Sequence, residues 1–254
     1  MSDLARPRRS VLYMPGAKAR ALEKARGLPA DALILDLEDA VGPTEKVAAR
    51  ELVVQTLEEG GFGLREVTVR VNGLDTEWGE ADIKAVAAMG PDAIVVPKVN
   101  APADLHAVEA LMDAAGAPAS TKIWAMMETP IGILNAREIA AATPRLACFV
   151  MGTNDLVKEL GALHTEGRAE VTTSLGWCLL AARAHGLAIL DGVYNGYQDA
   201  EGNRAACRMG REMGFDGKTL IHPAQLDIAN EEFGPSEADV ELAKRQVKAF
   251  EETR

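Results

Sequence analysis

The sequence predicts a TIM (β/α)8 barrel, which is a closed ring of eight parallel strands with helices around it. A short apolar segment followed by a helix-forming segment occurs eight times within 254 residues. Eight such units in about 250 residues is the usual size of this barrel. Polar residues also follow the apolar segments, where the active sites of barrels lie. Because we find no linker and no low-complexity tract, we expect one barrel domain over residues 1–254.

Eight segments have the composition of strands that are buried on both faces. In chain order they are Ser10–Pro15, Ala32–Glu38, Glu66–Asn72, Ala93–Val99, Lys122–Glu128, Ala147–Thr153, Leu187–Val193 and Gly217–Pro223. Helix-forming residues fill the intervals, most clearly in Lys46–Glu59, Ala103–Ala115 and Glu237–Glu252. An open, doubly wound sheet is the alternative, but its GxGxxG turn is absent.

The composition excludes several classes of function. The formal net charge of −11 disfavours binding to nucleic acid. We find no apolar segment of about 18 residues, the length needed to cross a membrane, and no signal peptide at the N-terminus. The three cysteines have no metal-binding spacing. We therefore expect a cytoplasmic protein with reduced thiols and with neither nucleic acid nor membrane as a partner.

Two carboxylates at the ends of adjacent predicted strands are the best candidates for metal ligands. Glu128 ends the fifth strand and Asp155 follows the sixth, so both side chains can reach one point. Two carboxylates completed by water and substrate oxygens form a typical Mg²⁺ site. The alternative is that Glu128 caps the next helix and Asp155 stabilises a turn.

Charged residues also follow the second and third strands. Arg70 could bind a substrate carboxylate through its guanidinium group, or it could pair with Asp36, Glu38 or Asp39. We interpret these three carboxylates as groups that orient Arg70 and metal-bound water. Alternation along the strand would place Asp36 and Glu38 on one side, and any of the three could instead cap a helix.

A basic helix face follows the first strand. Arg20 and Lys24 are four residues apart and share that face, which is either solvated or able to hold phosphates. Tyr13 belongs either to the core or to the cavity at the mouth. His222 either contacts substrate or has a structural role.

Six segments together resemble the citrate lyase β-subunit-like family, within the HpcH/HpaI aldolase and malyl-CoA lyase superfamily. They are Arg9–Gly16, Leu35–Val41, Val69–Asn72, Met127–Gly132, Gly152–Leu156 and Ile221–Pro223, and they occur in the family's order. Each segment is weakly specific alone, but the ordered set covers the chain from about residue 8. Asp39 stands where the related pyruvate aldolases typically have histidine, which favours the acyl-CoA branch.

The resemblance implies a trimer or hexamer of TIM barrels with Mg²⁺ held by Glu128 and Asp155. It implies that Arg70 binds a substrate carboxylate or carbonyl oxygen, and we predict catalytic roles for Arg70, Glu38 and Asp39. The substrate and CoA site would be formed by Tyr13, Arg20, Lys24, Arg70, Glu128, Gly152, Thr153, Ile221 and His222. Family members usually continue into a small lid, and this chain ends at Arg254, so we expect no lid within it.

The predicted activity is reversible carbon–carbon cleavage of a 3-hydroxyacyl-CoA, of the malyl-CoA or citramalyl-CoA type, into acetyl-CoA and a 2-oxo acid. The cofactor would be Mg²⁺, and the CoA thioester would be the substrate. One alternative is a malyl-CoA-type thioesterase with the same site. Others are a citrate lyase β subunit acting on an acyl carrier partner, or a ligand-binding relative without activity.

Overall fold

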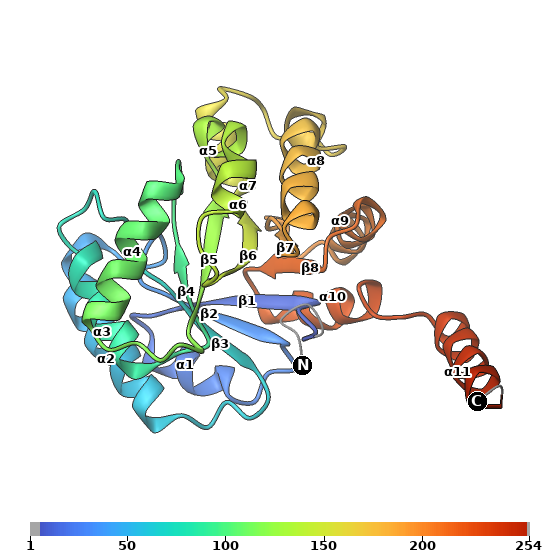
Figure 1. The fold of residues 1–254 in the computed structure, drawn as a ribbon, viewed down its shortest axis with the longest axis horizontal. Coiled ribbons are helices and arrows are strands. Elements are labelled where there is room, and N and C mark those ends of the chain that lie inside the picture. The colour runs from blue at the N-terminus through green and yellow to red at the C-terminus, as the bar shows by residue number, and fades with distance from the viewer. Residues whose placement is uncertain (1–5, 253–254) are drawn as a thin grey trace.

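The computed structural model describes residues 6–252 and confirms the predicted barrel. Eight parallel strands follow one another in chain order around the ring, and β1 pairs with β8 to close it. Helices surround the strands on the outside (Figure 1). The carboxyl ends of all eight strands therefore meet at one mouth.

The strands agree with the predicted segments in position but end earlier. They are β1 (Ser10–Pro15), β2 (Ala32–Asp36), β3 (Glu66–Arg70), β4 (Ala93–Val96), β5 (Lys122–Met127), β6 (Leu146–Met151), β7 (Ala188–Asp191) and β8 (Gly217–Leu220). Only β1 has the predicted carboxyl end. In the other strands the hydrogen-bonded ladder stops before polar residues such as Glu38, Asn72 and Glu128. These residues follow the strands and lie beyond the edge of the sheet.

Eleven α-helices occur within residues 6–252. They are α1 (Ala19–Ala25), α2 (Lys46–Glu59), α3 (Gly79–Met89), α4 (Pro102–Ala114), α5 (Pro130–Leu134), α6 (Ala136–Ala140), α7 (Thr153–Glu159), α8 (Ala169–Ala184), α9 (Ala200–Met213), α10 (Leu226–Glu232) and α11 (Glu237–Glu252). Two short helices, α5 and α6, connect β5 to β6, while α7 and α8 connect β6 to β7.

Two separate apolar clusters fill the molecule. One lies inside the ring and includes Val11, Ile34, Trp124 and Val150, while the larger one packs the strands against the helices. Below the inner cluster the guanidinium group of Arg8 stands 5.4 Å from the Trp124 ring and pairs with Glu66. Side chains thus fill the lower part of the barrel.

The last helix lies apart from the barrel. Figure 1 shows α11 at the end of an extended connection, beyond α10. Val240, Leu242 and Val247 on this helix are exposed. Within the described part of the chain, no helix is both long and apolar enough to cross a membrane. All three cysteines are buried free thiols.

Asp191 ends β7 but points away from the mouth, in contrast to the polar cluster expected at the strand ends. Its carboxylate accepts hydrogen bonds from both terminal nitrogens of Arg168, at 2.8 and 2.6 Å, and from Lys218 Nζ at 2.7 Å. The side chains of Asp191 and Lys218 are fully buried between strands and helices. Burial favours the neutral carboxyl, but the Lys218 and Arg168 cations hold the pKa of Asp191 below its usual range.

Replacing Asp191 with alanine should lower the free energy of unfolding by about 3–5 kcal/mol, because it leaves the Lys218 cation buried without its carboxylate. Urea unfolding followed by circular dichroism measures this loss. Glu80→Ala, which breaks the exposed pair with Lys84, is the matched control and should change stability by at most about 0.5 kcal/mol. Equal effects of the two substitutions would contradict the structural role of Asp191.

Candidate active site

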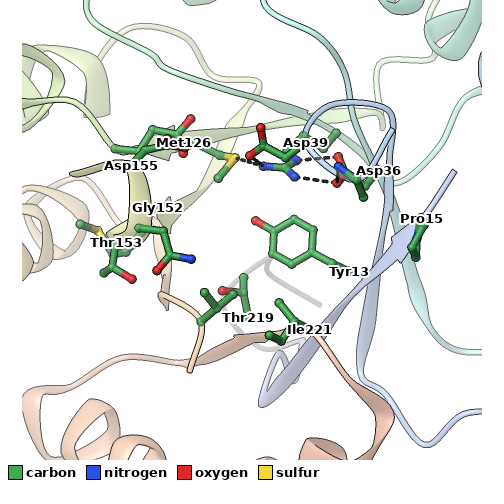
Figure 2. A pocket seen from close by; sticks show the side chains of 16 residues that line it. Tyr13, Pro15, Asp36, Asp39, Met126, Gly152, Thr153, Asp155, Thr219 and Ile221 are labelled. Atoms are coloured by element: carbon green, nitrogen blue, oxygen red, sulfur yellow. Dashed lines mark hydrogen bonds and ion pairs between the residues drawn. The ribbon is translucent and has the colours of Figure 1, made fainter. Parts of the chain in front are cut away.

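A cavity of about 330 Å³ opens at the mouth of the barrel. Its charged lining residues are Asp36, Asp39, Arg70, Glu128 and Asp155. Its apolar lining includes Met126, Met151, Val193 and Ile221. Figure 2 shows these side chains converging from opposite sides of the ring. Carboxylates and one guanidinium group over an apolar floor form a small polar site in surroundings of low dielectric, where charges interact strongly.

Arg70 is fixed at the end of β3 by a two-point ion pair. Its Nε and one terminal nitrogen donate to the two carboxylate oxygens of Asp36 at 2.7 and 2.6 Å (Figure 2). The other terminal nitrogen, Nη1, lies 3.0 Å from Glu38 Oε2 and 3.4 Å from Asp39 Oδ2. The proposed ion pairs with these carboxylates are therefore present, and the guanidinium group, which has partners at all three nitrogens, also lines the cavity.

Tyr13 belongs to the cavity wall as well as to the packing. The guanidinium carbon of Arg70 lies 4.8 Å from the centre of the Tyr13 ring, within the range of a cation–π contact. Burial, together with the carboxylates nearby, raises the pKa of the Tyr13 hydroxyl, although the Arg70 charge opposes this. Tyr13 thus presents a neutral hydroxyl beside the fixed cation (Figure 2).

Glu38 and Asp39 differ in their position. Asp39 lines both this cavity and a neighbouring one, whereas Glu38 lines the neighbouring cavity and is not among the residues that line this one. The carboxylates of Asp36 and Glu38 both contact the Arg70 guanidinium group, although β2 ends at Asp36 and Glu38 lies beyond the ladder. Burial raises the pKa of Glu38 against the opposing Arg70 charge. Burial also acts to raise the pKa of Asp39, but the hydrogen bond with Glu38 and the Arg70 charge lower it overall.

Glu128 is a buried carboxylate among other carboxylates. Its side chain is about 1% exposed, and its Oε1 accepts the backbone N–H of Lys98 at 2.7 Å. Burial raises the pKa of Glu128 to about 8, and the negative charges of Asp155 and Glu38 add to the effect. The negative charge of ionised Glu128 is thus not fully balanced by nearby positive charge, and a bound cation would balance it.

The donor set around Glu128 fits a magnesium ion. Glu128 and Asp155 line the same cavity, and both present oxygen, the ligand atom that Mg²⁺ prefers. Residues 6–252 contain no group of three or more His, Cys, Asp or Glu placed to hold a metal. A cation here would therefore use these two carboxylates and take its other ligands from water or substrate oxygens.

The remaining predicted site residues divide into two groups. Gly152, Thr153 and Ile221 line the cavity. Arg20 and Lys24 are exposed on α1, outside the lining described for this cavity. His222 is also outside it: its Nδ1 accepts the Ala224 N–H at 3.1 Å, and its ring stacks on Tyr197 at 4.7 Å. These contacts within the protein agree with the structural role that we considered for His222.

Sequence reasoning missed part of the cavity wall. Met126, Met151, Val193 and Thr219 line it but carry no chemical motif. Asp36 lines it directly, although we interpreted it only as a supporting group. Strand alternation could have identified Met126. It stands two residues before Glu128, so both side chains point into the ring, Met126 from β5 and Glu128 from the residue after it.

The sequence is similar to a known protein family and to individual members of it. The HpcH/HpaI aldolase/citrate lyase family model matches residues 9–223. The (3S)-malyl-CoA thioesterase of Cereibacter sphaeroides strain KD131 is 60% identical over 252 residues, covering 99% of this chain and 86% of that protein. Citrate lyase subunit beta of Escherichia coli K12 is 37% identical over 251 residues, covering 97% and 83%.

A solved structure shows the same architecture. CitE from Mycobacterium tuberculosis, in complex with magnesium, acetoacetate and coenzyme A, superposes with a TM-score of 0.79 at 29% identity. The match covers 99% of this chain and 90% of that one. The chain therefore belongs to the HpcH/HpaI aldolase/citrate lyase family, a family of enzymes, and the resemblance inferred from the six segments is confirmed.

Gly152→Ala should disrupt the cation site without altering any charged group. A methyl group at Gly152 would overlap both the Cβ and the carboxylate of Glu128, so the glutamate would have to move. We expect Mg²⁺ affinity, measured by calorimetry, to fall by at least about tenfold, as when a metal ligand loses its support. Gly167→Ala is the control, because a methyl group there meets no atom within 4 Å. Unchanged affinity in Gly152→Ala would argue against Glu128 as a ligand.

Magnesium binding should strengthen as the pH rises from 6 to 8. Because the pKa of Glu128 is raised to about 8, the folded protein without a cation holds this proton almost fully at pH 6 and about half of the time at pH 8, and Mg²⁺ must displace it. The gain in melting temperature on adding Mg²⁺ should therefore be larger at pH 8 than at pH 6. Glu128→Gln, which has no such proton, should lose this dependence. An equal gain at both pH values would contradict the assignment.

Proposed function

We propose that this protein is a Mg²⁺-dependent enzyme that hydrolyses the thioester of a malyl-CoA-type substrate. The observation that carries the proposal is the combination of the Glu128–Asp155–Arg70 cavity with 60% identity to a (3S)-malyl-CoA thioesterase along almost the whole chain. CitE, whose structure was determined with magnesium and coenzyme A, supports the same cofactor and the same class of ligand.

The cation site would be formed by Glu128 and Asp155. When bound, Mg²⁺ would supply Lewis-acid polarisation of a substrate oxygen. The Arg70 guanidinium group, which lines the cavity, would donate hydrogen bonds from Nη1 to a carboxylate or to the developing oxyanion. Asp36 fixes the orientation of the guanidinium group by accepting hydrogen bonds from Nε and the other terminal nitrogen.

Proton transfer would involve the two adjacent carboxyl groups of Glu38 and Asp39. Asp39 lines the cavity and has a lowered pKa, so it is ionised at neutral pH and able to take a proton from water. The water oxygen would then bond to the thioester carbon, the carbon–sulfur bond would break, and the proton taken up by Asp39 would pass to the leaving CoA sulfur. Glu38, whose pKa burial raises, would share that proton through its hydrogen bond with Asp39 before the transfer.

The basic face of α1 would receive the CoA portion of the substrate. Arg20 and Lys24 are exposed on a helix that follows β1, whose Pro15 lines the cavity. On a chain with a net charge of −11, such a face is suited to phosphates. We also assign contacts with the acyl-CoA to Tyr13, Gly152, Thr153, Ile221 and His222.

Carbon–carbon cleavage is the second candidate, favoured by 37% identity to citrate lyase subunit beta. The same cation and Arg70 would bind the two oxygens of a 2-oxo acid, and the other product would be acetyl-CoA. A trimer or hexamer is part of either proposal. The exposed apolar residues Val240 and Val247 on α11 support contact with another copy.

One incubation distinguishes the two reactions. Purified protein with Mg²⁺ and malyl-CoA should yield malate and free CoA, read by mass spectrometry, and EDTA should abolish the conversion. Glu128→Gln should reduce kcat by about 10²-fold or more, as expected when electrostatic stabilisation is lost. Leu64→Ala, at a fully exposed position, is the control. Acetyl-CoA and glyoxylate as products would establish the lyase instead, and no turnover of the CoA ester would refute both.

A further inference from the structure

Lys98 has an unusual backbone conformation directly beside the cation site. Its φ angle is +49°, and Arg168 is the only other non-glycine residue with positive φ in the described part of the chain. The left-handed region is disfavoured for residues with a Cβ atom. Lysine has no special tendency to adopt it, so the surrounding structure must hold it there.

The left-handed turn directs the Lys98 N–H out of the sheet. Strand β4 ends at Val96, and the Val99 N–H returns to a main-chain carbonyl, that of Met126, at 3.3 Å. Between these points the Lys98 N–H donates to Glu128 Oε1 at 2.7 Å. The Glu128 carboxylate thus takes the place of a ladder carbonyl. One of its oxygens is committed to the backbone, and the other remains for a cation.

The side chain of the same residue reaches a different carboxylate. Lys98 Nζ lies 3.2 Å from Glu38 Oε1, and the other oxygen of Glu38 lies 3.0 Å from Arg70. A glycine would adopt the backbone conformation without cost, but it would not supply this cation. Lys98 therefore connects Glu128 through its backbone with the Glu38–Arg70 pair through its ammonium group.

We infer that Lys98 is a positioning residue for both halves of the site: its left-handed backbone fixes Glu128 for cation binding, and its ammonium group fixes Glu38 behind Arg70. This inference rests on the proposed function, since it requires Glu128 to be a cation ligand. It assigns Lys98 no contact with the substrate. Both halves can be tested by substitutions at this one position.

The backbone half is tested by variants that all lack the ammonium group but differ in their tolerance of positive φ. Glycine and asparagine accept the left-handed region, alanine less so, and valine least. Calorimetric titration with Mg²⁺ should show the weakest binding in Lys98→Val, with Kd at least about tenfold above that of Lys98→Gly. Lys98→Asn should resemble Lys98→Gly. Circular dichroism establishes that each variant is folded, and Lys98→Ala provides the comparison if Lys98→Val does not fold.

Equal Mg²⁺ affinity in the folded glycine variant and the folded alanine or valine variant would overturn the backbone half. Wild-type protein that binds no Mg²⁺ would instead refute the proposed cation site, and the inference with it. The two failures are therefore distinguishable from the wild-type titration alone. This measurement does not depend on turnover or on the identity of the substrate.

The ammonium half is tested by a double-mutant cycle on kcat. Lys98→Gly should lower kcat by about tenfold, as expected for loss of a supporting contact, and Lys98→Arg should recover most of that loss. In the Glu38→Gln background, Lys98→Gly should cause little further loss, because the contact it removes is already weakened. Independent, multiplying losses in the double variant, or an unchanged kcat in Lys98→Gly, would overturn this half.

Discussion

The arrangement of the site depends on one buried ion pair, between Arg70 and Asp36. A guanidinium group held at two points has little freedom to rotate, so its third nitrogen, Nη1, keeps a fixed position beside Glu38 and Asp39. The same cation offsets part of the repulsion among the carboxylates at the mouth. Without Arg70, the carboxylates of Asp36, Glu38 and Asp39 would be held close together with much less positive charge to balance them.

Burial and bonding divide the barrel into two regions. Below the mouth, the ring is filled by apolar side chains and its backbone groups are paired in the ladder. Above it, the chain leaves the ladder, and side chains take over its hydrogen bonds, as Glu128 does for Lys98. Functional groups are concentrated in this second region because backbone donors and acceptors are available there. The lower region supplies the rigidity that such a site requires.

Sequence alone was sufficient for the ring and for placing Glu128 and Asp155 at its mouth, because apolar segments of strand length that end in polar residues specify where the mouth lies. The direction of each side chain was harder to obtain. Asp191 has the same sequence signature as Glu128, yet it is out of phase with the inward Leu190 and is buried against Lys218. That phase depends on strand register, which arises from pairing between distant segments. The left-handed conformation of Lys98 likewise comes from tertiary contacts.

The site therefore lowers the stability of the folded protein when no cation is bound. Glu128 is almost fully buried near Asp155, and its raised pKa shows that the folded protein disfavours its charge. The left-handed Lys98 adds backbone strain at the same place. A divalent cation reverses the electrostatic part of this cost, so cation binding and stability are coupled. The apolar ring lies below these groups and apart from them. The barrel therefore stays folded although its mouth is destabilised, and a bound ligand would restore the lost free energy of folding.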